Sequence, residues 1–272
     1  MSLDEIQSIL QNHQIKPNNL LGQNFLVDTS LFPLLCNYAE LNYADVVLDA
    51  GAGFGFLTQY LAKKCKSVIA VEKDSKIAKI LKENVKNYDN ITVKNADILD
   101  VVPPAFNKII SLPPYYLSSQ FVTWLLQYTF DYAVIVVQKE FAQKLVAPPG
   151  SEAYGWLTVI SSVIIKAELL DEIPNWKFFP QPEVDSIILR LKPRLDSQIT
   201  ITNMHFFTNL TKWLFTQRNK KISNALIPFL KNECGLNKTA TEEIVHKLHL
   251  REKRARELTP IEFGELANEL AN

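Results

Sequence analysis

The chain has little cysteine, no excess of charge and no long apolar run. Its three cysteines, Cys36, Cys65 and Cys234, form no C-x-x-C pair, so neither a disulfide framework nor a zinc framework is expected and the thiols should stay reduced, as in a cytoplasmic protein. The four histidines form no plausible ligand set, and no metal is predicted. Lys and Arg together number 29, as do Asp and Glu, so any nucleic-acid surface must come from local clustering of charge.

Nothing in the sequence predicts a membrane partner. The most apolar segment, 156–165, is too short to span a bilayer and is followed by Lys166. The first residues, MSLDEIQSILQ, carry acids and lack the apolar core of a signal peptide. We therefore expect a cytoplasmic globular protein. Its 272 residues suffice for one large domain, or for a medium domain with a small companion.

Short β-branched runs alternate with helix-patterned segments through most of the first 190 residues. The runs are 45–51, 67–74, 91–97, 107–111 and 131–138. This alternation predicts an α/β fold, a Rossmann-like parallel sheet covered on both faces. Two later runs, 167–174 and 184–193, are expected to close the sheet as an antiparallel pair.

The β pattern ends near residue 195. The segments 205–217, 222–232, 241–250 and 260–270 are all helix-patterned, and Thr259-Pro260 predicts a capped helix start. We expect a Rossmann-like domain over residues 1–194 and a small α-helical domain over 195–272.

The stretch LDAGAGFGFLT (48–58) links the first strand to the first helix. Its glycines, Gly51, Gly53 and Gly55, allow close approach of a ligand to the backbone, but Phe56 stands where a dinucleotide fingerprint needs glycine. The pattern favours a ligand that carries an adenosine without phosphates. Tight strand-to-helix turns also use glycine for steric reasons alone.

Two acids follow neighbouring strands. Glu72 ends the second strand, where a carboxylate can accept both hydroxyls of a ribose, and Asp97 follows the third, within range of an adenine amino group. Either acid alone is as well explained by a solvated loop. Because ligands bind at the carboxyl ends of parallel strands, the combination favours S-adenosyl-L-methionine.

The fourth strand leads into SLPPYYLSS (111–119). Prolines here fix the carbonyl groups, and Tyr115 can offer its ring to a flat base. Such a site suits an exocyclic amine, activated by positioning and hydrogen bonding, on a base that has left its stack. The alternative is a rigid turn with two tyrosines packed in the core.

At this point the chain resembles the ribosomal RNA adenine dimethyltransferases that act near the 3′ end of small-subunit rRNA. The motifs that carry the resemblance cover nearly all of the chain: LGQNFLVD (21–28), DAGAGFGFLT (49–58), VVQKEFAQKLVAPPGSEAYGWLTV (136–159), FFPQPEVDS (178–186), FTQRNKKISNAL (215–226) and ARELTPIEFGELA (255–267). The family usually has Glu where this chain has Asp49. The resemblance implies methylation of adenine N6, with dimethylation expected, by a monomer within a pre-ribosomal particle.

The resemblance also implies site residues. The expected cofactor contacts are Gln23, Asn24, Leu26, Gly51, Gly53, Gly55, Glu72, Lys73, Asp97, Ile98 and Ser111. The expected catalytic residues are Ser111, Leu112, Pro114, Tyr115 and Phe179, with Phe179 stacking on the target base.

One position departs from the family pattern. The family has Asn, an acceptor for the adenine amino group, where alignment on Pro114 and Tyr115 places Leu112, which cannot accept a hydrogen bond. Ser111, one residue earlier, could supply a hydroxyl, and main-chain carbonyls remain. An alternative is therefore a ribosome-assembly factor that binds rRNA with weak or no methyl transfer. A nicotinamide-dependent oxidoreductase is a weaker alternative, which Phe56 disfavours.

Basic residues cluster in the segment 211–256, which has eleven Lys and Arg and four acids. The residues expected to contact RNA phosphates are Arg218, Lys220, Lys221, Arg251, Lys253 and Arg254. The alternative is a solvated helix face. Lys63, Lys64 and Lys66 are expected to form only such a face.

Overall fold

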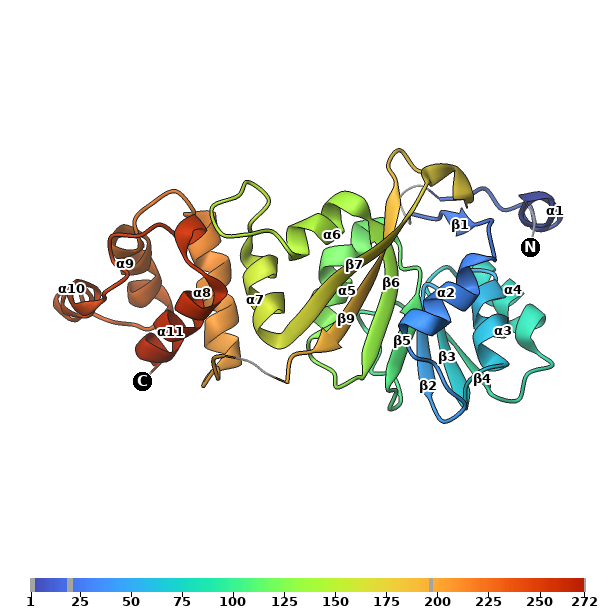
Figure 1. Cartoon of the computed structure of the whole chain (residues 1–272), viewed down its shortest axis with the longest axis horizontal. Helices are drawn as coiled ribbons and strands as arrows, with labels where there is room; N and C mark the ends of the chain where they lie inside the picture. The colour runs from blue at the N-terminus through green and yellow to red at the C-terminus, as the bar shows by residue number, and fades with distance from the viewer. Residues whose placement is uncertain (1–2, 19–21, 196–197, 272) are drawn as a thin grey trace. The chain divides into compact units, whose positions relative to one another are not determined.

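The computed structural model describes residues 3–18, 22–195 and 198–271 of the chain (Figure 1). The chain forms two compact units. The first, here called the sheet unit, comprises Met1–Ala142 and Lys166–Pro193, and the second, the helical unit, comprises Gln143–Ile165 and Arg194–Asn272.

A seven-stranded sheet forms the centre of the sheet unit. In chain order its strands are β2 (Val46–Ala50), β3 (Ser67–Glu72), β4 (Ile91–Asn95), β5 (Lys108–Ser111), β6 (Tyr132–Gln138), β7 (Ile165–Ile173) and β9 (Ser186–Pro193). Their spatial order is β4-β3-β2-β5-β6-β9-β7. The first five pair in parallel, whereas β9 runs antiparallel to β6. The predicted Rossmann-like architecture is therefore confirmed, with each predicted parallel strand in place.

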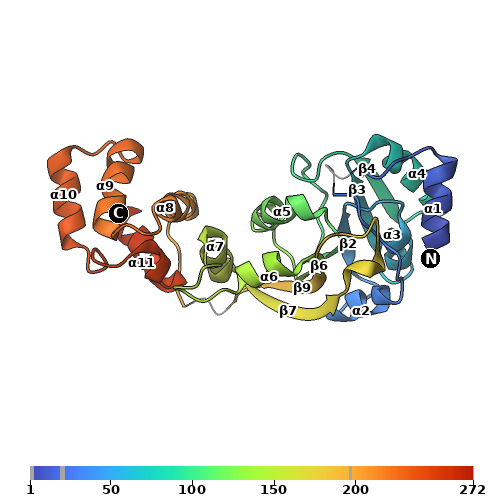
Figure 2. The same ribbon diagram turned by 90° about the horizontal axis from the view of Figure 1, so that it is seen from above.

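Helices cover both faces of this sheet. They are α2 (Leu31–Tyr38), α3 (Phe56–Ala62), α4 (Ser75–Val85) and α5 (Ser118–Leu125). Figure 2 shows α2 and α5 on opposite sides. Strands such as β6 are buried along almost their whole length, which is why they read as continuous apolar runs rather than alternating ones.

The strand order reverses between β2 and β5. From β2 the chain proceeds outward through β3 and β4, then returns to β5 on the other side of β2. At such a reversal the connections that follow the two strands diverge and leave a crevice at their carboxyl ends. The glycine loop follows β2, and the SLPPYY turn follows β5, so both border this crevice.

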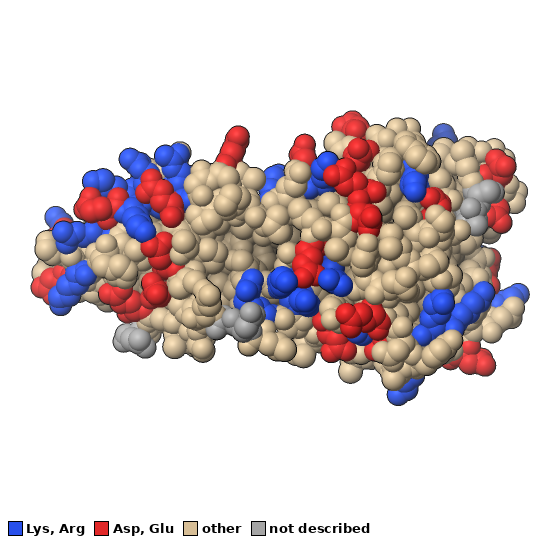
Figure 3. Space-filling view, in the orientation of Figure 1, with Lys and Arg blue, Asp and Glu red and all other residues tan. Residues whose placement is uncertain are grey.

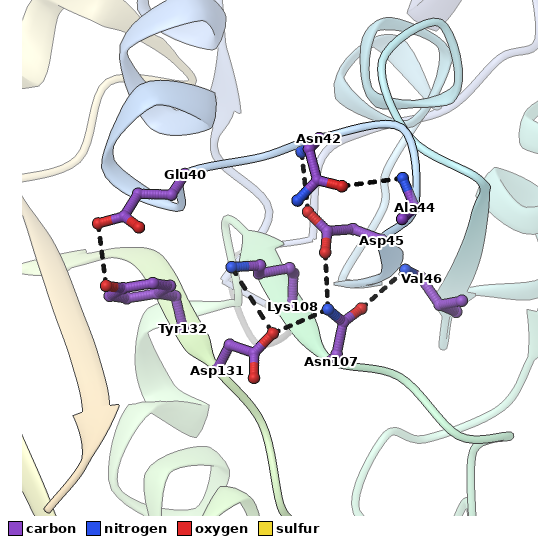
Figure 4. Close-up of polar contacts among 9 residues, drawn as sticks. All are labelled: Glu40, Asn42, Ala44, Asp45, Val46, Asn107, Lys108, Asp131 and Tyr132. Carbon is purple, nitrogen blue, oxygen red and sulfur yellow. Dashed lines mark hydrogen bonds and ion pairs between the residues drawn. The ribbon is translucent and has the colours of Figure 1, made fainter.

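The opposite, amino ends of the strands are closed by a polar network (Figure 4). The Asn107 side chain donates to Asp45 Oδ1 at 2.6 Å and to Asp131 Oδ2 at 2.9 Å, and its oxygen accepts from Val46 N at 2.8 Å. Buried Lys108 lies 3.8 Å from the Asp131 carboxylate. These contacts hold the starts of β2, β5 and β6 together, and leave the carboxyl ends as the open side.

A short two-stranded ladder lies apart from the main sheet. Strand β1 (Phe25–Leu26) pairs antiparallel with β8 (Phe178–Phe179), with Phe25 opposite Phe179 and Leu26 opposite Phe178. Helix α1 (Leu3–Asn12) contributes Ile6 and Leu10 to a cluster that includes Phe54 of the glycine loop. The N-terminal segment is thereby packed beside the crevice.

The helical unit contains α7 (Trp156–Ile164), α8 (Met204–Thr216), α9 (Ile222–Glu233), α10 (Lys238–Lys247) and α11 (Pro260–Ala271); α6 (Lys139–Leu145) crosses from one unit into the other. The division at Pro193 lies close to the predicted boundary at 194, but the segment 143–165 groups with the C-terminal helices. The physical reason is local packing. Helix α7 contacts α8 and α11, and the buried Tyr154 hydroxyl donates to Leu258 O at 2.7 Å.

The remaining sequence expectations concern thiols, metals and membranes. Cys36 and Cys65 are buried in the sheet unit, where burial raises their thiol pKa values to about 11 and about 12. Across the described ranges no cluster of three metal-ligating side chains occurs. No helix among the described residues has the length and apolar character to cross a bilayer.

Candidate active site

Three adjoining hollows open at the crevice, and Gly51 borders all three. The central lobe, about 620 Å³ with the open solvent at its mouth included, lies between the glycine loop, residues 22–25 and the 112–116 turn. The β4-side lobe, about 340 Å³ on the same measure, lies between Glu72, Asp97 and Pro113. The α3-side lobe, about 460 Å³ on that measure, extends toward Leu26 and Leu57. The structure thus brings Gly53, Glu72 and Tyr115 to one opening, and Asp97 to the lobe beside it.

Glu72 organises the glycine loop. Its Oε2 accepts from Gly53 N at 2.9 Å, and its Oε1 accepts from Asp74 N at 2.9 Å. Burial raises the pKa of this carboxyl, although the two N–H donors oppose the shift. Each carboxylate oxygen has a second lone pair, so Glu72 can still accept hydrogen bonds from a ligand in the central lobe.

The β4-side lobe is mostly apolar but is bordered by two carboxylates, Glu72 and Asp97, and by Lys73. Ile98 and Leu117 contribute buried side chains, and Asp97 accepts from Lys73 Nζ at 2.7 Å and from Leu99 N at 3.0 Å. Burial works to raise the pKa of Asp97, but the Lys73 hydrogen bond, the Leu99 N–H and the Lys73 charge together lower it. The lobe therefore combines flat apolar walls with an ionised acceptor, which suits a purine carrying an amino group.

The three glycines of the loop do different work. Gly51 and Gly53 border the lobes, and a Cβ on Gly53 would meet only the Phe25 ring, at 3.6 Å. Gly55 (φ +86°) borders none of them, and a Cβ there would lie 2.5 Å from Leu81 Cδ1 on α4. Gly55 is therefore required by helix packing, and its predicted cofactor contact has no geometric support.

The N-terminal motif lines the opening from the other side. Gln23 and Asn24 border the central lobe, while Leu26 borders the α3-side lobe. The Gln23 amide donates to Asp74 Oδ2 at 3.1 Å, which ties this segment to the start of α4. Leu21, the first residue of the motif, lies outside the described residues.

Asp49 lies at the inner end of the α3-side lobe and is almost completely buried. Its Oδ2 accepts from the Thr58 hydroxyl at 2.7 Å. Burial raises the pKa of Asp49 to about 7, with a hydrogen bond from Thr58 opposing the shift and the Glu72 charge adding to it. The site therefore contains a carboxyl that titrates near neutral pH.

Among the aromatic residues that border the central lobe, two contact each other. Tyr115 and Phe178 meet edge to face with centroids 6.3 Å apart. The Tyr115 hydroxyl is 2.5 Å from buried Ser186 Oγ, and burial raises the Tyr115 pKa to about 12. Tyr115 is therefore neutral at physiological pH, and its ring is fixed at both ends.

Phe179, predicted to stack on the target base, does not border the central lobe. Phe179 packs with Ile6, Leu10 and Phe54, away from the lobe that Phe178 lines. Neighbouring residues of a strand point to opposite faces, so only one of the two can face the opening. Counting along F-x-P-x-P-x-V-x-S from Ser186 also assigns the motif's Phe to position 178.

Ser111 also differs from expectation. It is fully buried and borders none of the three lobes, and its hydroxyl donates to Ala50 O at 2.8 Å within the sheet. Neither a cofactor contact nor an amine contact fits this placement. Leu112 does line the central and α3-side lobes, and its side chain packs against the core on that face of the sheet.

A second candidate surface lies in the helical unit. The segments QRNKK (217–221) and REKRAR (251–256) lie side by side, with Ile222 N donating to Lys253 O at 2.8 Å and Ser223 N to Arg251 O at 3.0 Å. Lys221 pairs with Glu252 at 2.7 Å and Lys253 with Glu262 at 2.5 Å. We call these two segments the basic patch. Figure 3 shows basic and acidic side chains interleaved over the α9–α10 end.

The predicted phosphate contacts are not equivalent. Arg218 donates to the carbonyl oxygens of Glu152 and Ser151, both at 3.2 Å, and Arg254 donates to Asn219 O. These guanidinium groups fix loops. Lys220, by contrast, is exposed, so it is the best placed of the predicted residues for a phosphate.

Sequence reasoning missed Tyr116. Its ring borders both the central and the β4-side lobes, and a Cβ on Gly22 would lie 3.2 Å from it. The signal was available, because Tyr116 follows Tyr115 directly in the turn. Lys73, Asp97 and Ile98, which are predicted to contact the cofactor, all border the β4-side lobe.

Comparison with known proteins places these observations in context. Residues 14–263 match the family model described as ribosomal RNA adenine dimethylase. The chain is 36% identical over 267 residues to a probable ribosomal RNA small subunit methyltransferase A of Methanosarcina acetivorans, covering 97% of each chain. It is 35% identical over 270 residues to the protein of the same description from Pyrococcus furiosus, covering 97% and 95%. A dimethyladenosine transferase from Plasmodium falciparum superposes with a TM-score of 0.78 at 27% identity, covering 91% and 96%.

Proposed function

Because the chain belongs to the ribosomal RNA adenine dimethylase family, we propose that it transfers methyl groups from S-adenosyl-L-methionine to N6 of adenosines near the 3′ end of small-subunit rRNA. The single observation that supports this most directly is the crevice between β2 and β5. There a lobe suited to an adenine adjoins a lobe bordered by Tyr115 and Phe178. The β4-side lobe fits the adenine of the cofactor, and the central lobe would hold the rest of the cofactor together with the substrate base beside Tyr115 and Phe178.

The residues present suit S-adenosyl-L-methionine. Glu72 would accept hydrogen bonds from the ribose hydroxyls, and Asp97, beside Ile98, would accept a hydrogen bond from the adenine amino group. Gln23 and Asn24 would border the methionine end, with Gly51 and Gly53 leaving the backbone open to it. When bound, the cofactor supplies a methyl group on a positively charged sulfur.

The protein's own contribution is to hold the target base. Tyr115 and Phe178, which contact each other edge to face, would form an apolar wall of the slot for a base that has been withdrawn from its stack. The amine nitrogen would form the new N–C bond as the sulfur–methyl bond breaks, with that bond's electron pair leaving on the sulfur of S-adenosylhomocysteine. The nitrogen would then release its proton to water, so no side-chain nucleophile is required. Catalysis then rests on positioning and on acceptors for the amine N–H groups.

Those acceptors come from the main chain in this protein. The Leu112 side chain has no hydrogen-bond acceptor, and the Ser111 hydroxyl already donates a hydrogen bond to Ala50 O. The Leu112 carbonyl oxygen lies 3.5 Å from a Cβ built on Gly51, a position at the border of all three lobes. We assign the amine contact to the carbonyls of Leu112 and Pro113, which the two prolines hold rigidly.

The helical unit is proposed to position the enzyme on its RNA. Contacts from the basic patch to phosphates would orient the particle without reading sequence. We further propose that the protein acts as a monomer, in the cytoplasm, on a pre-ribosomal small-subunit particle.

The test uses undermethylated small subunits and labelled S-adenosyl-L-methionine. We expect label on adenine N6, recovered as dimethyladenosine after digestion, and a loss of at least about 100-fold in kcat for Tyr115→Ala, whose removal withdraws one wall of the slot. Calorimetry with S-adenosylhomocysteine checks that this variant still binds the cofactor product. Cofactor binding and rRNA binding without any label would favour the ribosome-assembly factor instead.

A further inference from the structure

One large aromatic side chain near the site is left exposed. Trp176 is 65% exposed, in the turn η3 (Asn175–Lys177) that leads directly into β8. The other three tryptophans, at 124, 156 and 213, are buried or half-buried. Only Lys177 separates Trp176 from Phe178 in the chain, so their Cα atoms are at most about 7 Å apart. An exposed indole therefore lies next to the wall of the proposed base slot.

The turn that carries Trp176 is held firmly. Asn175 N donates to Asp185 Oδ1 at 2.9 Å, and the Asn175 side chain donates to Pro182 O at 3.1 Å and accepts from Gln181 at 3.0 Å. The Lys177 carbonyl accepts from Val27 N at 2.8 Å. The backbone is thus fixed from three sides, and the exposure of the ring is not the result of a loose loop.

The chemistry of the turn favours a base over a phosphate. The one cation in the turn, Lys177, forms an ion pair with Asp28 at 2.8 Å, so its charge is already compensated. Lys177 Nζ also lies 5.6 Å from the centroid of the Trp176 ring, so the turn offers a base one face of the indole. Bases of single-stranded RNA stack on such faces irrespective of sequence.

We propose that Trp176 stacks on the base of a nucleotide adjacent to the target adenosine. The inference rests on the proposed function, since it assumes that an adenosine enters the central lobe beside Tyr115 and Phe178. Trp176 would then hold the neighbouring nucleotide while the target is withdrawn, acting on substrate binding and not on the transfer itself.

The experiment measures kcat and KM with undermethylated small subunits for wild type, Trp176→Ala and Trp176→Phe. We expect Trp176→Ala to raise KM by roughly 5- to 100-fold, the range found when a stacking side chain is removed, with kcat nearly unchanged. Trp176→Phe should stay within about threefold of wild type. The control is Tyr43→Ala, which removes an aromatic ring that is 78% exposed but lies at the amino ends of the strands. It should change neither constant.

A second experiment identifies the nucleotide whose base stacks on Trp176. Subunits reconstituted with an abasic nucleotide on either side of the target adenosine should raise KM for wild type at one of the two positions, but not raise it further for Trp176→Ala. Equal KM values for wild type and Trp176→Ala would overturn the inference, as would a loss that follows a lowered Tm. Absence of methylation by wild type itself would instead refute the proposed function.

Discussion

At the scale of single residues, Leu112 is the position where chemistry and packing conflict. Its side chain contributes to the core and at the same time borders the two lobes where donor and acceptor groups must meet. An apolar side chain there adds packing but removes an acceptor for the amine. The balance between the two effects can be measured by substitution.

We expect Leu112→Asn to raise kcat. A well-placed acceptor that acts in the transition state contributes about 2.7–4 kcal/mol, or roughly 100- to 1000-fold, and this sets the upper limit because an approximate fit gains less. Leu112→Ala is the control, since it loses the same packing and adds no acceptor. The measurement is single-turnover methylation of undermethylated subunits. An Asn variant no faster than the Ala variant would mean that the main-chain carbonyls suffice.

Asp49 gives a pH-dependent prediction. Its pKa is raised by burial to about 7 in the folded protein, whereas the unfolded carboxyl ionises near pH 4. Between these values the folded state keeps a proton that the unfolded state has released. Stability from this group is therefore complete below about pH 4, falls as pH rises to about 7 and is constant above.

Comparison of wild type with Asp49→Asn isolates that contribution. Between pH 4 and pH 8 the free energy of unfolding of wild type should fall relative to the variant, by about 4 kcal/mol at most. Urea denaturation at each pH measures it, and other titrating groups cancel in the difference. Parallel curves for the two proteins would show that Asp49 ionises normally in the folded state.

At the scale of elements, different glycines of the glycine loop serve ligand binding and helix packing. The sequence pattern treats Gly51, Gly53 and Gly55 alike, because spacing alone does not reveal which neighbour each glycine meets. The structure places α4 against Gly55, so that the approach of two helices and not a ligand excludes a side chain there.

We expect Gly55→Ala to lower the free energy of unfolding by about 2–4 kcal/mol, since it combines a left-handed backbone with an overpacked contact to Leu81. Gly53→Ala should lower stability less, because its Cβ meets Phe25 only at 3.6 Å, but it should weaken binding of S-adenosylhomocysteine. Denaturation and calorimetry on both variants distinguish the two. If Gly53→Ala and Gly55→Ala weakened S-adenosylhomocysteine binding equally, the assignment of Gly53 to binding and Gly55 to packing would be contradicted.

Long periodic elements were predictable and short ones were not. The strands of the parallel sheet and the C-terminal helices follow from apolar patterning, and α9 forms even with Pro228 inside it. The ladder of β1 and β8 has two residues in each strand, too few for any period to register. That ladder decides which of Phe178 and Phe179 faces the central lobe, although the motif spacing counted back from Ser186 also assigns Phe178.

The same limit applies to Ser111, whose serine type suggested an available hydroxyl. Only the pairing of β5 beside β2 reveals that the Ser111 hydroxyl donates its hydrogen bond to Ala50 O. Tertiary contacts, which the local sequence does not carry, therefore determined the details of the site. The kind of site was predictable because strand ends in an open parallel sheet converge whatever their exact register.

At the scale of the whole molecule, the formal net charge is zero, but positive charge is concentrated locally in the basic patch. The basic patch gathers cations from two segments about 30 residues apart, yet acids such as Glu252 and Glu262 pair with several of them. RNA affinity should accordingly come from fewer cations than the sequence count suggests, and exposed Lys220 should contribute more than Lys221 or Lys253.

Salt dependence tests this directly, because each phosphate contact releases bound counterions and steepens the fall of log K with log salt. Lys220→Ala should reduce that slope by about 0.7–0.9 and weaken binding of small-subunit rRNA. Lys253→Ala should reduce it less, since Glu262 already compensates its charge. The matched control is Lys63→Ala, which removes an exposed lysine at the end of α3 and should leave the slope unchanged.

Because the patch lies in the helical unit and the cofactor lobes in the sheet unit, none of these changes should alter S-adenosylhomocysteine binding. A slope that responds equally to all three substitutions would mean that RNA binding follows overall charge and not this patch.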